Sequence, residues 1–123
     1  MNLLSIDYGT KRVGLAVSIL GVISPLSTVP NDDTLVSVIK ALSHQYQIGQ
    51  IYVGISEGSF AATTKLFVEK LKNSTSIPII TVEEAVSTIE ADKIFKDNRN
   101  KRKNYKKQID SIAAAVILSR VQV

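Results

Sequence analysis

The opening stretch, residues 3–18 with the sequence LLSIDYGTKRVGLAVS, most limits what this chain can fold into. It contains a nearly all-apolar run, a short turn at residues 8–11, and a second run in which larger apolar and small residues alternate. Alternation with a period of two is typical of a strand. Gly9 supplies the backbone freedom that a short turn needs. We therefore predict a hairpin formed by strands at residues 1–7 and 11–18.

The first of these strands ends on a carboxylate, Asp7. A carboxylate at the end of a hydrophobic strand loses hydration unless a cation, a hydrogen-bond partner or exposure at the strand's tip compensates. Turn formation before a glycine also explains an aspartate at this point. The importance of Asp7 therefore depends on which other acids reach the same edge of the fold.

Composition sets the class of protein. A length of 123 residues, with 45% apolar and 21% charged residues, predicts a single globular domain covering residues 1–123. The absence of cysteine excludes disulfides, thiolate zinc sites and cysteine nucleophiles. The longest apolar run, residues 112–118, is far shorter than the roughly 20 residues of a membrane span, and no signal-peptide pattern opens the chain. We expect a cytoplasmic protein.

Positive charge is concentrated in one segment, residues 96–107 (KDNRNKRKNYKK). This segment has seven of the fifteen basic residues and one acid, so the rest of the chain is slightly acidic although the net charge is +4. Such an asymmetry fits a polyanionic partner such as nucleic acid, although an exposed solvated segment would look the same. The candidate nucleic-acid contacts here are Arg99, Lys101, Arg102, Lys103 and Lys106.

The remaining elements predict one mixed sheet. After a third strand, a helix begins near Asp32 or Asp33, either of which could cap it, and continues to near Gly49. Three consecutive strands can pair antiparallel, and two strand–helix units then add parallel strands. The fold class is therefore α/β, a five-stranded mixed sheet in the order βββαβαβα flanked by helices. The other predicted strands cover residues 22–28, 50–55 and 78–82. The other predicted helices cover about residues 60–72, 87–95 and 109–121.

Acids follow the predicted strands at points that can converge. Asp7 ends the first strand, Glu83 and Glu84 end the fifth, and Asp110 lies in the first turn of the last helix. If the first, fourth and fifth strands are parallel neighbours, their carboxyl ends share one edge, where open α/β sheets form their site. Converging carboxylates repel each other unless a cation neutralises them, and oxygen ligands favour Mg²⁺ or Mn²⁺.

The best-known use of such a cluster is phosphodiester hydrolysis with two metal ions, for which Asp7, Glu84 and Asp110 would be the catalytic and metal-binding residues. The basic segment would hold the phosphate backbone beside them. Each acid also has a simpler explanation, since Glu84 can be solvated and Asp110 favours a helix dipole.

Three stretches resemble the YqgF family, also called RuvX, which has an RNase H-like fold. Residues 7–18 (DYGTKRVGLAVS) match the family's opening DYGTKR-(I/V)-G-x-A-V-S, and residues 109–118 (IDSIAAAVIL) resemble its last helix, D-x-x-AA-x-IL. A weaker match is residues 83–88 (EEAVST), where the family has DERL(T/S)T. The resemblance implies metal binding by Asp7, Glu84 and Asp110, with Mg²⁺ or Mn²⁺, and substrate phosphates near Thr10, Lys11 and Arg12.

The resemblance further implies a nuclease that acts on structured nucleic acid, as a monomer or homodimer. Maturation of the 5′ end of pre-16S rRNA is the favoured activity, and resolution of four-way DNA (Holliday) junctions is the alternative. Two departures keep a catalytically weakened nucleic-acid-binding protein open: Ala85 replaces the family arginine, and the loop GLPxNxDGS is shortened to residues 54–59. The DYGT turn also looks like the first phosphate motif of actin-like ATPases, but those enzymes need two such domains.

Overall fold

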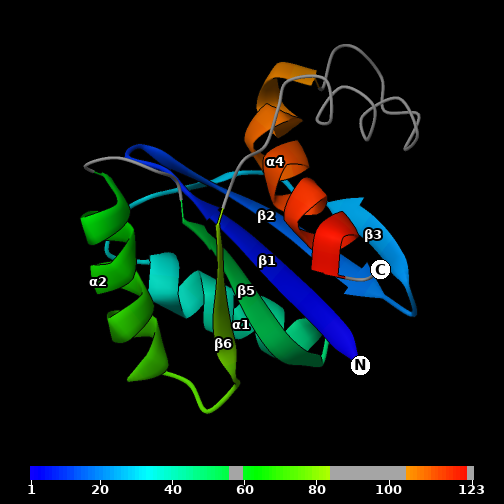
Figure 1. Cartoon of the computed structure of the whole chain (residues 1–123), viewed down its shortest axis with the longest axis horizontal. Coiled ribbons are helices and arrows are strands. Elements are labelled where there is room, and N and C mark those ends of the chain that lie inside the picture. The colour runs from blue at the N-terminus through cyan, green and yellow to red at the C-terminus, as the bar shows by residue number, and fades with distance from the viewer. Residues whose placement is uncertain (56–59, 84–104, 122–123) are drawn as a thin grey trace.

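A mixed sheet with helices on both faces forms the body of the molecule (Figure 1). The computed structural model describes residues 1–55, 60–83 and 105–121, with the side chains of the last range described from Ile112 onward. Within these residues the sheet has the strand order β3-β2-β1-β5-β6, and β4 pairs with β2. The strands are β1 (Asn2–Tyr8), β2 (Arg12–Ile19), β3 (Val22–Pro25), β4 (Val29–Pro30), β5 (Ile48–Ile55) and β6 (Ile79–Glu83), and the helices are α1 (Leu35–Gln45), α2 (Phe60–Lys72) and α4 (Tyr105–Val121).

The mixed α/β class predicted from the sequence is confirmed, with differences in detail. The predicted third strand stops at Pro25 and the two-residue β4 follows, so the described sheet has six strands where five were predicted. Proline lacks the N–H that a continued ladder would need. The helix expected at 87–95 lies outside the described residues.

The boundaries of α1 and α4 also differ from the prediction. Thr34, not Asp32 or Asp33, occupies the N-cap position of α1. The helix ends at Gln45, earlier than expected, because Gln47 takes a left-handed conformation (φ 51°) and β5 begins at the next residue. The last helix starts at Tyr105 rather than near residue 109.

The central strand β1 divides the core between two faces. It pairs antiparallel with β2 and parallel with β5. Leu4 and Ile6 are fully buried in the larger core cluster, which includes residues of α1 and α2, and Tyr8 packs against it. Ser5 lies on the opposite face, where Figure 1 shows α4 in front of the sheet while α1 lies behind it. Asp7 is two residues from Ser5, and side chains alternate along a strand, so Asp7 also lies on the α4 face.

Helix α4 lies close against the sheet because small residues meet at the contact. Ala114 and Ala115 of α4 and Ala16 of β2 are all fully buried in one cluster. The Ser5 hydroxyl donates a hydrogen bond of 2.6 Å to the Ala114 carbonyl oxygen, so the buried hydroxyl is paired. Among the described helices, none has both the length and the apolar character that crossing a membrane requires.

We expect Ser5→Ala to lower the free energy of unfolding by about 1 kcal/mol, because it removes a buried hydrogen bond that joins β1 to α4. Urea unfolding of both proteins measures this difference. Ser43→Ala is the matched control: its buried hydroxyl bonds only to the Ile39 carbonyl within α1. Alanine is the better helix former, so the free energy of unfolding of Ser43→Ala should stay within about 0.5 kcal/mol of the wild-type value. Equal losses in the two variants would contradict an anchoring role for Ser5.

Candidate functional site

The carboxyl ends of three parallel strands meet at one edge of the sheet. Strand β1 is parallel to β5 with Asp7 opposite Gly54, and β5 is parallel to β6 with Ile55 opposite Glu83. The strands predicted at residues 1–7, 50–55 and 78–82 correspond to β1, β5 and β6. Their predicted arrangement as parallel neighbours is therefore confirmed. This edge is where open α/β sheets form their sites.

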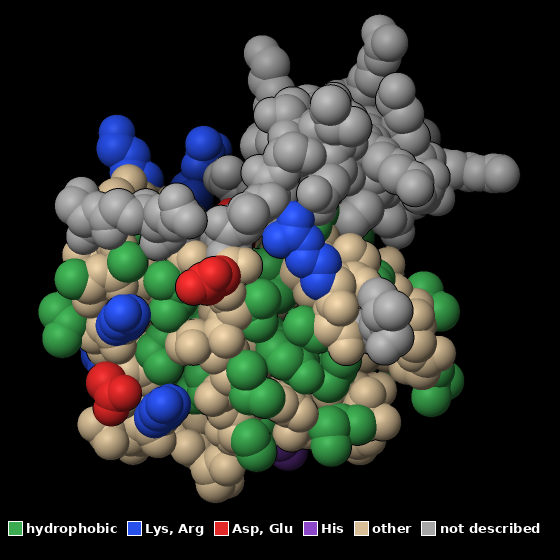
Figure 2. All heavy atoms as spheres, in the orientation of Figure 1, with side chains coloured by type: hydrophobic (Ala, Val, Ile, Leu, Met, Phe, Trp, Pro, Cys, Tyr) green, Lys and Arg blue, Asp and Glu red, His purple; other side chains and the backbone are tan. Residues whose placement is uncertain are grey.

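A hollow of about 290 Å³ lies at this edge and is lined by Asp7, Gly9, Thr10, Lys11 and Arg12. The last three are exposed, and Asp7 is partly buried. Figure 2 shows basic side chains along the upper edge of the molecule, the end at which Figure 1 places the β1–β2 turn. One carboxylate and two cationic side chains therefore share a single hollow, a combination that suits a phosphate group bound beside a cation.

The turn between β1 and β2 is held by Asn31, a residue that the sequence analysis did not single out. Its backbone N–H donates to the Lys11 carbonyl at 2.9 Å, and its Nδ2 donates to the Gly9 carbonyl at 2.7 Å. Asparagine in a loop commonly bonds to nearby backbone, but this partner lies 22 residues away in the chain. The described peptides are trans, so the N–H of Thr10 points away from the bonded Gly9 carbonyl. Asn31 therefore fixes the backbone that presents residues 10–12.

Helix α4 brings Asp110 toward the same end and face of the sheet as Asp7. Ala114 is bonded to Ser5, and Figure 1 shows the C-terminal end of α4 at the end of the sheet where β1 begins, so α4 runs antiparallel to β1. Asp7 lies about 6.6 Å beyond Ser5 along the strand, from a rise of about 3.3 Å per residue. Residue 110 lies about 6 Å from Ala114 along the helix axis, from a rise of about 1.5 Å per residue. The backbones at these two acids are thus level with each other.

Strand alternation decides the face of the sheet on which Glu83 lies. Ile79 packs against the core cluster of α1 and α2. Because side chains alternate along a strand, Glu83 shares the face of Ile79 and lies opposite the face of Asp7. Glu83 is exposed, and it is not a candidate for a cluster with Asp7.

Several predicted site residues belong to the part of the chain that the structure does not describe. Glu84 and four residues of the basic segment, Arg99, Lys101, Arg102 and Lys103, lie outside the described residues, as do the side chains of Lys106 and Asp110. In the part of the chain that is described, no three His, Cys, Asp or Glu side chains lie close enough together to hold a metal ion. The three-carboxylate cluster therefore stays a prediction.

Asp32, at the start of α1, is an acid with a structural role. Its Oδ1 accepts hydrogen bonds from the Thr34 hydroxyl at 2.5 Å and the Thr34 backbone N–H at 2.9 Å. These bonds lower the pKa of Asp32 below its ordinary value of 3.8. This lowered pKa stabilises the folded protein at any pH above the ordinary pKa. The stabilisation is lost as the pH falls through the lowered pKa. Asp32 is therefore ionised at neutral pH as part of the turn that begins α1.

Comparison with known proteins gives consistent matches over nearly the whole chain. A family model described as "RuvX: Holliday junction resolvase" matches residues 1–121. A curated "Putative pre-16S rRNA nuclease" of Sulfurihydrogenibium sp. is 39% identical over 127 residues, covering 95% of this chain and 86% of the relative. Another of the same name, from Halothermothrix orenii, is 32% identical over 130 residues and covers 96% and 91% of the two chains.

A solved structure, the fowlpox virus Holliday junction resolvase, aligns with a TM-score of 0.60 at 12% identity, with 100% of both chains covered. At this identity the likeness concerns the fold, and it confirms the RNase H-like architecture.

We expect Gly9→Ala to destabilise the β1–β2 turn by about 1–3 kcal/mol, because a Cβ built on Gly9 would lie 2.4 Å from the Arg12 carbonyl oxygen. Thermal unfolding of the variant measures the loss. Gly49→Ala is the control, since a Cβ there would meet the flexible Met1 side chain, with Cγ at 2.6 Å, which can move aside. A Gly9→Ala protein that melts at or above the temperature of Gly49→Ala would show that the close approach is easily relieved.

Proposed function

This chain belongs to the RuvX family of Holliday junction resolvases, and on that premise we propose that it is a divalent-metal-dependent nuclease that hydrolyses phosphodiester bonds in structured nucleic acid. The observation that carries the proposal is the hollow at the carboxyl edge, where Asp7 lies beside Thr10, Lys11 and Arg12. In a metal-assisted attack on a phosphodiester, a carboxylate can hold the ion, and cationic groups beside it can orient the phosphate.

The residues proposed to hold the metal are Asp7, Glu84 and Asp110. Their donors are all carboxylate oxygens, which suit Mg²⁺ or Mn²⁺. When bound, the ion would supply charge stabilisation at the phosphate and a more acidic attacking water. The level positions of the Asp7 and Asp110 backbones on one face of the sheet support this assignment. The alternation of β6, which turns Glu83 to the other face, favours Glu84 as the third ligand.

The chain's own cations are proposed to bind and orient the substrate. Lys11 and Arg12 would pair with phosphate oxygens next to the scissile bond, and Thr10 would contribute its hydroxyl and backbone N–H. The basic residues Arg99, Lys101, Arg102, Lys103 and Lys106 would hold the backbone farther from the cut, as nonspecific electrostatic contacts do.

For the substrate, we propose the 5′ region of pre-16S rRNA, because the curated relatives are named for that precursor. The description of the matching family model favours a Holliday junction as the second candidate. We further propose that residues 1–123 act as one domain in the cytoplasm, as a monomer or a homodimer.

We expect Asp7→Asn to lower the cleavage rate more than about 100-fold, because loss of a metal ligand costs more than the 10- to 100-fold typical of outer-shell partners. The assay offers precursor rRNA and a four-way DNA junction with Mg²⁺ or Mn²⁺, and EDTA should stop the reaction. Asp33→Asn, an exposed acid in the loop before α1, is the control for the same chemical change. Equal cleavage by Asp7→Asn and wild type would exclude the site, and binding without cleavage in either metal would favour the noncatalytic alternative.

Strand alternation predicts different results at the two neighbouring glutamates. We expect Glu84→Gln to lower metal-dependent cleavage to the same extent as Asp7→Asn, while Glu83→Gln retains the wild-type rate, because Glu83 lies on the face opposite Asp7. Cleavage rates at several Mn²⁺ concentrations measure both effects. A large loss in Glu83→Gln with none in Glu84→Gln would reverse the assignment of the third ligand.

A further inference from the structure

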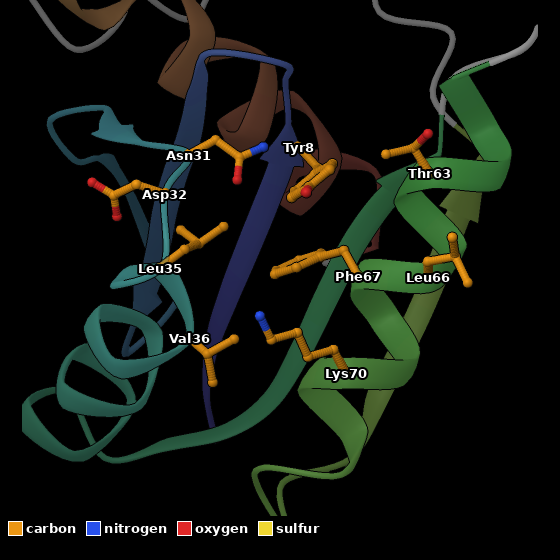
Figure 3. Close-up of a pocket in the computed structure, with 9 residues that line it drawn as sticks. All are labelled: Tyr8, Asn31, Asp32, Leu35, Val36, Thr63, Leu66, Phe67 and Lys70. Carbon is orange, nitrogen blue, oxygen red and sulfur yellow. The ribbon is translucent and has the colours of Figure 1, made fainter.

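A second hollow, of about 240 Å³, opens between α1 and α2 on the face of the sheet opposite Asp7 (Figure 3). Pockets for drug-sized ligands usually measure about 300–1,000 Å³, so this groove suits one ring system rather than a larger molecule. Nothing in the proposed cleavage chemistry uses it. Its lining consists of Tyr8, Asn31, Asp32, Leu35, Val36, Thr63, Leu66, Phe67 and Lys70.

The central walls of the groove are apolar, and one of them is aromatic. Figure 3 shows Leu35 and Val36 of α1 pointing across the groove toward Phe67 of α2. The rings of Phe67 and Tyr8 stack, with centroids 4.3 Å apart and an interplanar angle of 16°. Tyr8 also stacks on Phe60 at 5.7 Å. Phe60 does not line the groove, so the aromatic part of the wall is the stacked pair of Tyr8 and Phe67. Together with the aliphatic Leu35 and Val36, this pair makes a slot that suits a flat ligand.

Polar groups lie at both ends of this slot. At one end Asn31 points toward Tyr8, and at the other Lys70 extends beneath Phe67 into the groove (Figure 3). Because Nδ2 of Asn31 donates to the Gly9 carbonyl, the polar atom that this amide offers the groove is its oxygen, an acceptor. Lys70 offers only donors. A complementary ligand therefore donates a hydrogen bond at one end and accepts one at the other.

The groove is connected to the β1–β2 turn through Asn31, which lines the groove and bonds to the carbonyls of Gly9 and Lys11. Tyr8 makes a second connection, because it directly follows Asp7 in β1. A nucleic-acid strand whose phosphate is bound at residues 10–12 would therefore lie next to the turn that Asn31 joins to the groove.

We propose that this groove binds one unpaired base of the substrate strand, and that it selects cytosine, which presents an amino donor and a carbonyl acceptor, over uracil. The inference rests on the proposed function. The amino group would donate to the Asn31 oxygen, and the carbonyl would accept from Lys70. Uracil carries a carbonyl oxygen where cytosine has its amino group, and its ring N–H lies between two carbonyls, so it would present an acceptor to the Asn31 oxygen and make a poorer match. The carboxylate of Asp32 near the mouth disfavours a phosphate as the occupant.

The test measures binding of a cytidine octamer and a uridine octamer by fluorescence anisotropy, in EDTA so that cleavage plays no part. We expect the wild type to bind the cytidine octamer at least about 5-fold more tightly, the range of one net hydrogen bond. Lys70→Met should remove this preference, because it keeps the length of the side chain but not the donor. Val36→Phe, which fills the slot, should remove it as well.

Lys65→Met is the matched control, since Lys65 is an exposed lysine of the same helix that does not line the groove. It should weaken the binding of both octamers by the same factor and leave the ratio of the two affinities unchanged. Thermal melting checks that every variant is folded. A preference that survives in Lys70→Met, or a wild type that binds both octamers equally, overturns the inference while nucleic-acid binding stands. A wild type that binds neither octamer, precursor rRNA nor junction DNA overturns the proposed function along with it.

Discussion

The contact between α4 and the central strand β1 is the interaction on which the arrangement of the candidate active site depends. It consists of one buried hydrogen bond, from Ser5 to the Ala114 carbonyl, and close packing around Ala114 and Ala115. Both parts are short-range, so they fix the height of the helix along the strand as well as its distance. One turn of helix beyond Ala114 and two strand residues beyond Ser5 cover nearly the same length. The level of the backbone at Asp110 relative to that at Asp7 is therefore set by packing in the core.

The alternation of β1 assigns different chemistry to the two faces of the sheet. Asp7 lies on the face of α4, and the next residue, Tyr8, packs on the face of α1 and α2. A single strand thus supports both the proposed metal site and the aromatic wall of the groove. A shift of register by one residue would exchange these roles, and the pairing of β1 with strands on both sides prevents such a shift.

The sequence was sufficient to predict the features that depend on local patterns. The bounds of α2 agree with the prediction, and the strand alternation after Lys11 correctly indicated β2. It was not sufficient where an outcome depends on pairing between distant segments. The bond from Asn31 to the β1–β2 turn exists because β4 pairs with β2, and nothing near Asn31 in the chain indicates that pairing.

The candidate active site could also be predicted only in part from local sequence patterns. Asp7 could be chosen because it ends an apolar strand, but the sequence alone could not separate Glu83 from Glu84. The exclusion of Glu83 requires the face of Ile79, which is decided by packing against helices elsewhere in the chain. The acids themselves are visible in the sequence, whereas the side of the sheet on which each one lies is a property of the folded core.

The hydrogen bonds of Asn31 also have an electrostatic consequence for any ligand that approaches the β1–β2 turn. A peptide oxygen carries partial negative charge and repels a polyanion, and a tight turn usually exposes several such oxygens to solvent. In this turn the oxygens of Gly9 and Lys11 are both occupied by Asn31. An incoming nucleic-acid strand therefore meets a turn whose repulsive dipoles are partly neutralised before any lysine or arginine contributes.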